Sequence, residues 1–257
     1  MTGFLKANYH THTYRCQHAY GSEREYIEAA IRMGIAELGF SDHVPCPPFK
    51  DGYVSGIRMT MEQAPEYVYA IRELGKEYAS DIKLYVGFEA EYIPEFFKEQ
   101  KAMFDRLGCD YMIMGQHFMK SEQTGPYTGT PTDDESRIRE YVDTIIEGMK
   151  TGMYSYLAHP DLINYQGLDS VYEWEMTRMC KALKELNIPL EINMLGISAG
   201  KHYPTERFWC IPHDIGNKVI LGLDAHTVDN ICDVESYEKA LDIVRKYDLN
   251  LIDRIEI

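Results

Sequence analysis

Short apolar segments of strand character alternate with longer amphipathic segments along almost the whole chain, and this alternation limits the possible folds most strongly. The apolar segments are residues 5–12, 35–43, 82–92, 110–118, 154–161, 188–195 and 219–226. Helical spacing of apolar residues occurs at 22–34, 61–79, 94–108, 134–152, 171–187 and 236–250, with a shorter helical turn at 211–218. Seven strands alternating with helices predict a parallel sheet, either a closed barrel related to the (β/α)8 form or an open doubly wound sheet.

The first amphipathic segment carries signals for both of its ends. Ser22 and Glu25 have the spacing of a capping box, and Gly34 stands where a C-cap glycine belongs. No proline-, glycine- or serine-rich linker divides the chain, so residues 1–257 are predicted to form a single domain.

Charge and cysteine content narrow the classes of partner. Forty-one acidic against 26 basic residues give a net charge of −15, which repels nucleic acid unless bound metals supply a local positive site. The six cysteines are scattered, which predicts reduced thiols. No apolar run approaches the roughly 20 residues of a membrane span, and the N-terminus lacks the features of a signal peptide, so a cytoplasmic location is expected.

Almost every predicted strand ends in a side chain that can bind a metal. These side chains are His10, His12, His43, Glu89, His117, His159, Asp224 and His226. The strand at 188–195 is the exception and carries Glu191 and Asn193. Because the carboxyl ends of parallel strands converge on one face of a barrel, these ligands are expected to meet there. Imidazole and carboxylate ligands without cysteine suit zinc, manganese or iron at a catalytic site.

Two pairs of these ligands have the spacing of neighbours on one face of a strand. His10 with His12, and Asp224 with His226, are each predicted to act as a chelating arm. Each of these residues alone has an alternative to metal binding. Alternating histidines also occur in exposed strands, Glu89 could be a solvated carboxylate, and the other histidines could be capping or hydrogen-bonded core residues. Their joint placement at successive strand ends favours a metal site.

The motifs that contain these residues together resemble those of the PHP (polymerase and histidinol phosphatase) family, and more narrowly its monofunctional histidinol-phosphatases. The motifs are NYHTHTYRCQHA, GFSDH, GFEAEY, GQHF, AHPDLI and LGLDAH, with RMTMEQ before the second long helical segment and EINMLG…YP…F in the sixth unit. The resemblance covers nearly the whole chain. It implies a distorted (β/α)7 TIM-like barrel with a trinuclear metal site at the C-terminal face of the strands.

The resemblance also implies which residues hold three divalent ions of zinc, manganese or iron. The first ion would be held by His10, His12, Glu89 and Asp224. Glu89 would bridge to a second ion, which would also be held by His117 and His159. The third ion would be held by His18, His43 and His226. Asp224 would, in addition, exchange protons during catalysis.

The activity implied is hydrolysis of a phosphomonoester, L-histidinol phosphate, in histidine biosynthesis. Relatives with this activity carry arginines after the HPD motif and after the EIN strand, whereas these stretches read HPDLINYQG and MLGISAGKHYPTER here. The candidate substrate contacts in loops are therefore Arg15, Arg58, Lys201, His202 and Arg207. The alternatives are a phosphoesterase for another small ester or a short oligonucleotide, and a metal-binding module without catalysis.

Overall fold

The computed structural model describes residues 4–45 and 52–257, and all its named strands pair in parallel. One sheet has the order β1 (Ala7–Asn8), β2 (Glu37–His43), β3 (Lys83–Ala90) and β4 (Tyr111–Met114). The other has the order β5 (Leu190–Asn193), β6 (Lys218–Gly222) and β7 (Asn250–Leu251). Residues in β2 are almost all buried, as expected for a parallel strand covered on both faces.

Backbone contacts connect the two sheets on both sides, so the sheet curls around an interior. Residues 155–158 lie between β4 and β5, with a bridge from Leu157 to Met114 and another from Leu157 to Leu190. On the opposite side Thr11 pairs with Ala225. The protein therefore has an α/β fold with a curled parallel sheet.

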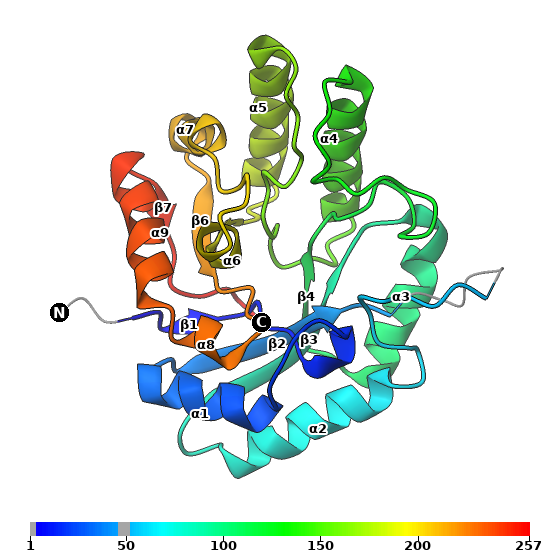
Figure 1. Ribbon diagram of the computed structural model, residues 1–257, viewed down its shortest axis with the longest axis vertical. Helices are drawn as coiled ribbons and strands as arrows, with labels where there is room; N and C mark the ends of the chain where they lie inside the picture. Colours follow the sequence, from blue (N-terminus) through cyan, green and yellow to red (C-terminus); the bar gives the residue numbers. More distant parts are fainter. Residues whose placement is uncertain (1–3, 46–51) are drawn as a thin grey trace.

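Helices surround this sheet on its outside (Figure 1). The long helices are α1 (Glu23–Met33), α2 (Ala64–Glu77), α3 (Pro94–Leu107), α4 (Glu135–Lys150), α5 (Asp169–Glu185), α7 (Glu206–Ile215) and α9 (Val234–Lys246). Three short helices lie in the segments after the carboxyl ends of β1, β5 and β6: η1 (Tyr14–Cys16), α6 (Met194–Ser198) and α8 (Val228–Ile231). These short helices therefore lie on the side of the sheet where the predicted ligands are found.

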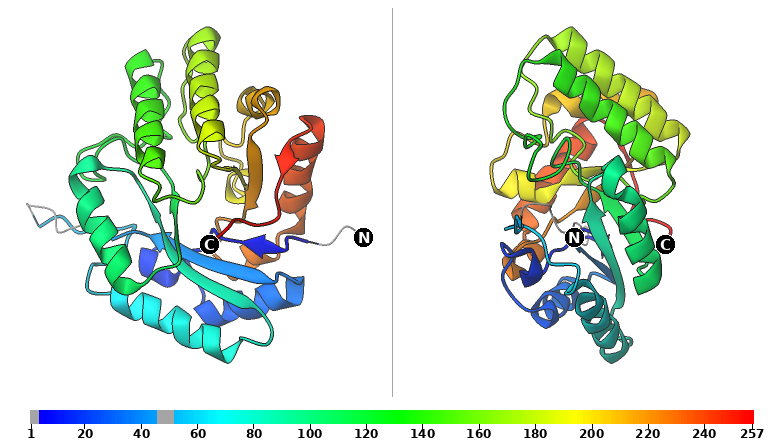
Figure 2. Two further views of the ribbon diagram at one scale, coloured as in Figure 1. Left: turned by 180° about the vertical axis from the view of Figure 1, so that it is seen from behind. Right: turned by 90° about the vertical axis from the view of Figure 1, so that its right-hand side faces the viewer.

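Apolar side chains form two clusters, one on each face of the sheet. The larger cluster packs the outward faces of the strands against the helices. The smaller one fills the interior and consists of Ala7, Tyr9, Tyr111, Ile113, Tyr156, Ala158 and Ile220. Ile252 and Ile255 from the last segment pack against it, and Figure 2 shows this segment from behind, in dark red. The carboxyl ends of the strands are left for polar side chains.

Several sequence predictions are confirmed, and others need correction. Ser22 and Glu25 form the predicted capping box of α1, and Gly34 is its left-handed C-cap. Residues 154–161 form bridges through Leu157 rather than a named strand, because His159 has a φ of +30° and Pro160 lacks an N–H, which end the extended backbone.

The remaining differences lie in the last third of the chain. The helical turn predicted at 211–218 is instead α7, which begins earlier because the Thr205 side chain accepts a hydrogen bond from the Phe208 N–H. The short helices α6 and α8 and the strand β7 were not predicted. A helix or strand of two to five residues contains too few residues to show a period.

No helix in the described parts of the chain combines the length and the apolar character that a membrane crossing needs.

Candidate metal centre

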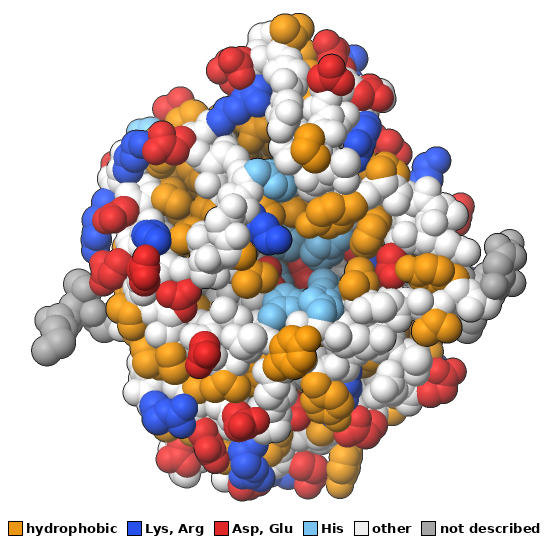
Figure 3. All heavy atoms as spheres, in the orientation of Figure 1, with side chains coloured by type: hydrophobic (Ala, Val, Ile, Leu, Met, Phe, Trp, Pro, Cys, Tyr) orange, Lys and Arg blue, Asp and Glu red, His pale blue; other side chains and the backbone are white. Residues whose placement is uncertain are grey.

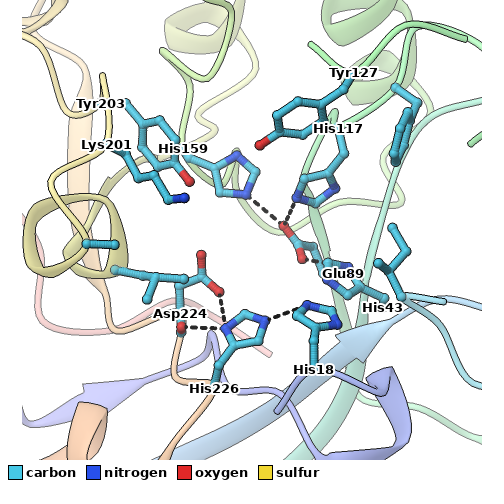
Figure 4. Close-up of a pocket in the computed structure, with 14 residues that line it drawn as sticks. His18, His43, Glu89, His117, Tyr127, His159, Lys201, Tyr203, Asp224 and His226 are labelled. Carbon is cyan, nitrogen blue, oxygen red and sulfur yellow. Dashed lines mark hydrogen bonds and ion pairs between the residues drawn. The ribbon is translucent and has the colours of Figure 1, made fainter. Parts of the chain in front are cut away.

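All nine predicted metal ligands meet at the carboxyl ends of the strands, around a cavity of about 560 Å³. Figure 3 shows their histidine side chains gathered in a central hollow that is bordered by hydrophobic side chains. Figure 4 shows the side chains that line this cavity. Cys46 and the other residues of 46–51 lie outside the described residues.

Four ligand atoms from three strand ends form the first group. They are His10 Nε2, His12 Nε2, Glu89 Oε2 and Asp224 Oδ1, and their four nitrogen–oxygen distances are 3.2–3.5 Å. Each atom is buried and has no hydrogen-bond partner among the described residues. Ligand atoms placed tetrahedrally at 2.0–2.1 Å from a zinc ion would be roughly 3.3 Å apart. Three of these residues, His10, His12 and Asp224, have ligand atoms within 4.8 Å of one another and could hold one divalent ion.

The other oxygen of Glu89 faces a second group. Glu89 Oε1 lies 2.9 Å from His159 Nε2 and 3.4 Å from His117 Nε2 (Figure 4). Glu89 is 1% exposed, so it is not the solvated carboxylate that the sequence left open. Its two oxygens point to separate sets of histidines, which is the arrangement required of a bridging ligand.

A third group consists of His18, His43 and His226. Their ligand atoms lie within 4.8 Å of one another, and His18 Nε2 is 3.0 Å from His226 Nε2. His226 Nδ1 also lies 3.3 Å from Asp224 Oδ1, so the two residues predicted to form one chelating arm lie side by side. Both follow the end of β6, and Asp224 has a left-handed φ of +50°.

Two buried carboxylates orient histidines of these groups from behind. Glu191 Oε2 lies 2.8 Å from His10 Nδ1, and Glu91 Oε1 lies 3.1 Å from His117 Nδ1. Asp42 Oδ1 lies 3.6 Å from His12 Nδ1, which is beyond hydrogen-bond distance. A carboxylate at Nδ1 fixes the ring and leaves Nε2 free to bind a metal. This orienting role was missed in the sequence.

Two of these carboxylates, Glu91 and Glu191, had some signal in the sequence. Glu91 lies two residues after Glu89 and so shares its side of the strand. Glu191 belongs to the one predicted strand that lacked a metal ligand at its end. Asn193, in that same strand, donates hydrogen bonds to Glu191 Oε1 at 2.8 Å and to Asp224 Oδ2 at 3.0 Å. This strand thus supports metal ligands rather than supplying one.

Opposite charges in the site shift the pKa values of its ligands. Burial alone would raise the pKa of Glu89, but His117, His10 and His43 hold it well below its usual range. Burial likewise opposes the charged form of Asp224, yet His10, His12 and His226 keep its pKa low. The two carboxylates are therefore ionised.

The histidines divide into two kinds. Burial alone would lower the pKa of His10, but Asp224, Glu191 and Glu89 hold it well above its usual value. Burial also opposes the charge on His12, but Asp224, Asp42 and Cys16 raise its pKa well above the usual value. Burial and the charge of His12 lower the pKa of His43, and they lower that of His226 to about 4. At neutral pH His10 and His12 therefore hold protons, whereas His43 and His226 are neutral.

Lys201 is the predicted substrate contact that lines the cavity. In Figure 4 it lies beside Tyr203, whereas Tyr127 lies on the other side of His159, near His117. Neither tyrosine was predicted, although Tyr203 belongs to the quoted YP motif. Lysine and tyrosine supply hydrogen-bond donors to this wall.

The other four candidates do not line this cavity, because other groups engage their side chains. Arg15 is buried and bonded to Glu23 and Glu66. Arg207 pairs with Asp169 Oδ1 at 2.8 Å.

Arg58 and His202 are also engaged elsewhere. Arg58 is buried against Glu91 and Glu122. His202 Nε2 lies 2.8 Å from the Leu162 carbonyl oxygen. A role of these four residues in substrate binding stays a prediction.

Comparison with known proteins identifies relatives of the whole chain. Residues 8–194 match the family model described as the PHP domain. A protein of Deinococcus radiodurans named "Probable histidinol-phosphatase" is 28% identical over 240 residues, covering 88% of this chain and 87% of that protein. The histidinol-phosphatase of Bacillus subtilis is 31% identical over 124 residues, or 46% of each chain.

A solved structure shares the fold. It is histidinol phosphate phosphatase from Lactococcus lactis subsp. lactis, complexed with zinc, L-histidinol and phosphate. The TM-score is 0.73 with 20% identity, and the match covers 98% of this chain and 99% of the other.

Proposed function

The chain belongs to the PHP domain family, and from this premise we propose that it is a metal-dependent phosphomonoester hydrolase that converts L-histidinol phosphate and water to L-histidinol and phosphate. One observation carries the proposal: the two oxygens of buried Glu89 face separate groups of histidines beside a cavity. The names of the Deinococcus and Bacillus relatives and the ligands of the lactococcal structure support the choice of substrate. The reaction would serve histidine biosynthesis, and a cytoplasmic location stays a prediction.

We further propose the distorted (β/α)7 barrel as the architecture of the single domain. Six of the named strands, β1 to β6, and the bridging segment 155–158 give the count of seven, with β7 as an additional short strand beside β6. The three ligand groups would hold three divalent ions, which could be zinc, manganese or iron, since these metals share imidazole and carboxylate ligands.

The protein's own residues would position the ester and manage its protons. Lys201 Nζ and the hydroxyls of Tyr127 and Tyr203 would donate hydrogen bonds to phosphate oxygens. Bound divalent ions would supply an acidified water and withdraw charge from the phosphate. Asp224, held at Oδ2 by Asn193, would exchange protons through the carboxylate. Ile57 and other apolar residues of the wall would exclude bulk water.

Removal of metal tests the proposal directly. Dialysis against EDTA is expected to abolish release of phosphate from p-nitrophenyl phosphate, and zinc or manganese is expected to restore it. A protein that binds these metals but stays inactive with each of them, on this ester and on histidinol phosphate, would be a metal-binding module instead.

Metal binding at neutral pH is expected to release protons. His10 and His12 have pKa values raised well above the usual value, so they are protonated in the metal-free site, and a metal must displace these protons. Apparent affinity should therefore increase as the pH rises from 6 to 8. Isothermal titration calorimetry in buffers of different ionisation enthalpy measures the release, and heats independent of buffer would contradict this prediction.

Replacement of Lys201 by alanine is expected to raise KM for a phosphate ester roughly 10- to 150-fold and to change kcat little, because a hydrogen bond to a charged group contributes about 1.5–3 kcal/mol. Steady-state kinetics of the metal-loaded variant measure this. Lys239→Ala is the control, since Lys239 is exposed and pairs with Glu235 on α9, away from the cavity lining. An unchanged KM for Lys201→Ala would remove this residue from phosphate binding.

A further inference from the structure

Arg58 is an arginine buried behind the metal centre. It is 2% exposed, and its guanidinium group stays charged at any physiological pH. Nη2 donates to Glu91 Oε1 at 2.7 Å, Nε donates to Glu122 Oε2 at 2.9 Å, and Nη1 donates to the Val44 carbonyl oxygen at 3.2 Å. Burial of a charge is costly unless it is paired and hydrogen-bonded. These acceptors from three segments fix the guanidinium in one orientation.

Glu91 extends this contact to a predicted metal ligand. The oxygen that accepts from Arg58, Oε1, also lies 3.1 Å from His117 Nδ1. On the other side of the ring, His117 Nε2 lies 3.4 Å from Glu89 Oε1. A hydrogen on Nδ1, donated to Glu91, leaves Nε2 as the nitrogen that can bind a metal. The orientation of the His117 ring therefore depends on the position of Glu91.

We propose that Arg58 is a positioning residue, which orients His117 for metal binding by holding Glu91 in place. The inference rests on the proposed role of His117 as a metal ligand. Among the described residues, neither Glu191 nor Asp42 forms an ion pair with an arginine or lysine. Asn193 holds Glu191, and Thr13 holds Asp42. Of these three carboxylates, Glu91 behind His117 is therefore the one that pairs with an arginine in the described parts of the chain.

The same guanidinium connects the metal centre to the wall of the cavity. Glu122, its second acceptor, also receives hydrogen bonds from Tyr53 Oη at 2.7 Å and from Ser55 Oγ at 2.9 Å. This ties residues 52–58 to the loop that follows β4. Ile57, adjacent to Arg58, lines the cavity. Loss of Arg58 would therefore loosen both His117 and this part of the wall.

Metal affinity provides the first test. Arg58→Gln is expected to weaken zinc binding 10- to 100-fold in competition with a fluorescent chelator, which is the usual effect of losing an outer-shell partner. Arg58→Lys keeps the charge but cannot reach all three acceptors, so an intermediate loss is expected. The control is Arg72→Gln, because Arg72 also pairs with a carboxylate, Asp110, outside the metal centre. The zinc affinity of this control should equal that of the wild type. Wild-type affinity in both Arg58 variants would overturn the proposal.

The tautomer of His117 provides a second test that needs neither metal nor activity. Long-range ¹H–¹⁵N NMR of the metal-free protein, at an alkaline pH where the His117 ring is neutral, is expected to show hydrogen on Nδ1 in the wild type and a mixture of tautomers in Arg58→Gln. An identical pattern in both proteins would also overturn the proposal. Because these spectra do not depend on catalysis, they decide the role of Arg58 even if the protein has no phosphatase activity.

A double-variant cycle tests whether Arg58 acts through Glu91. Arg58→Gln combined with Glu91→Gln is expected to bind zinc about as weakly as Glu91→Gln alone, since both changes break the same chain of contacts. Additive losses would show that Arg58 acts independently of Glu91. If Arg58→Gln does not fold, Arg58→Lys replaces it in the cycle.

Discussion

Replacing Glu89 with glutamine is expected to lower kcat/KM by roughly a thousandfold or more, about 4 kcal/mol of transition-state stabilisation. The structure places its Oε2 with His10 and His12 and its Oε1 with His117 and His159. An amide keeps the shape but loses the negative charge, and it presents one oxygen instead of two. Two ligand groups would therefore be weakened by one substitution.

Three measurements separate this effect from unfolding. Circular dichroism and the melting temperature should show a folded variant, while metal analysis should show fewer ions per chain than in the wild type. Glu99→Gln is the matched control, because Glu99 is exposed on α3 and the change removes the same charge. A Glu89→Gln variant with wild-type turnover would refute the bridging role.

A second large loss of metal affinity and activity is expected when Gly115→Ala adds a single methyl group to the site. A Cβ at position 115 would lie 1.9 Å from Glu89 Oε1 and 2.8 Å from His117 Cε1, which is closer than nonbonded atoms approach. Gly115→Ala must therefore displace the Glu89 carboxylate or the chain after β4. Either movement separates Oε1 from His117, so we expect metal affinity to fall 10- to 100-fold or more and kcat/KM to fall with it.

Gly75→Ala is a suitable control for this substitution. A Cβ at position 75 in α2 would make an ordinary contact of 3.7 Å with Leu84 Cβ. Alanine in a helix interior is about 0.5–1 kcal/mol more stable than glycine, so the control should melt at a slightly higher temperature and retain full activity. Equal metal affinity in Gly115→Ala and the wild type would contradict the packing described for Glu89.

The fold could be predicted where local signals are strong. Alternating segments predicted the parallel α/β arrangement, and Ser22, Glu25 and Gly34 defined the ends of α1. The segment around Leu157 was harder to predict, because its pairing with β4 and β5 depends on residues that are distant in sequence. Its extended backbone ends at His159. The short elements α6, α8 and β7 also depend on their neighbours rather than on periodicity.

The convergence of the predicted ligands on one cavity could be predicted, because parallel strands bring their carboxyl ends together. The conformation of Asp224 and His226 could not be predicted from strand spacing, since both residues follow the strand instead of belonging to it. The ion pairs of the loop arginines could not be predicted from the sequence. Arg15 pairs with Glu66 and Arg58 pairs with Glu91, which are distant in sequence, and one sequence does not reveal such partners.

The most direct test of the account is the specificity of the metal-loaded protein. Phosphate release from L-histidinol phosphate should be measured beside sugar, nucleotide and amino-alcohol phosphates, with zinc or manganese present. We predict a kcat/KM for L-histidinol phosphate well above that of every other ester, and its loss on chelation. Equal or faster hydrolysis of another ester would retain the metal chemistry and contradict the assignment to histidinol phosphate.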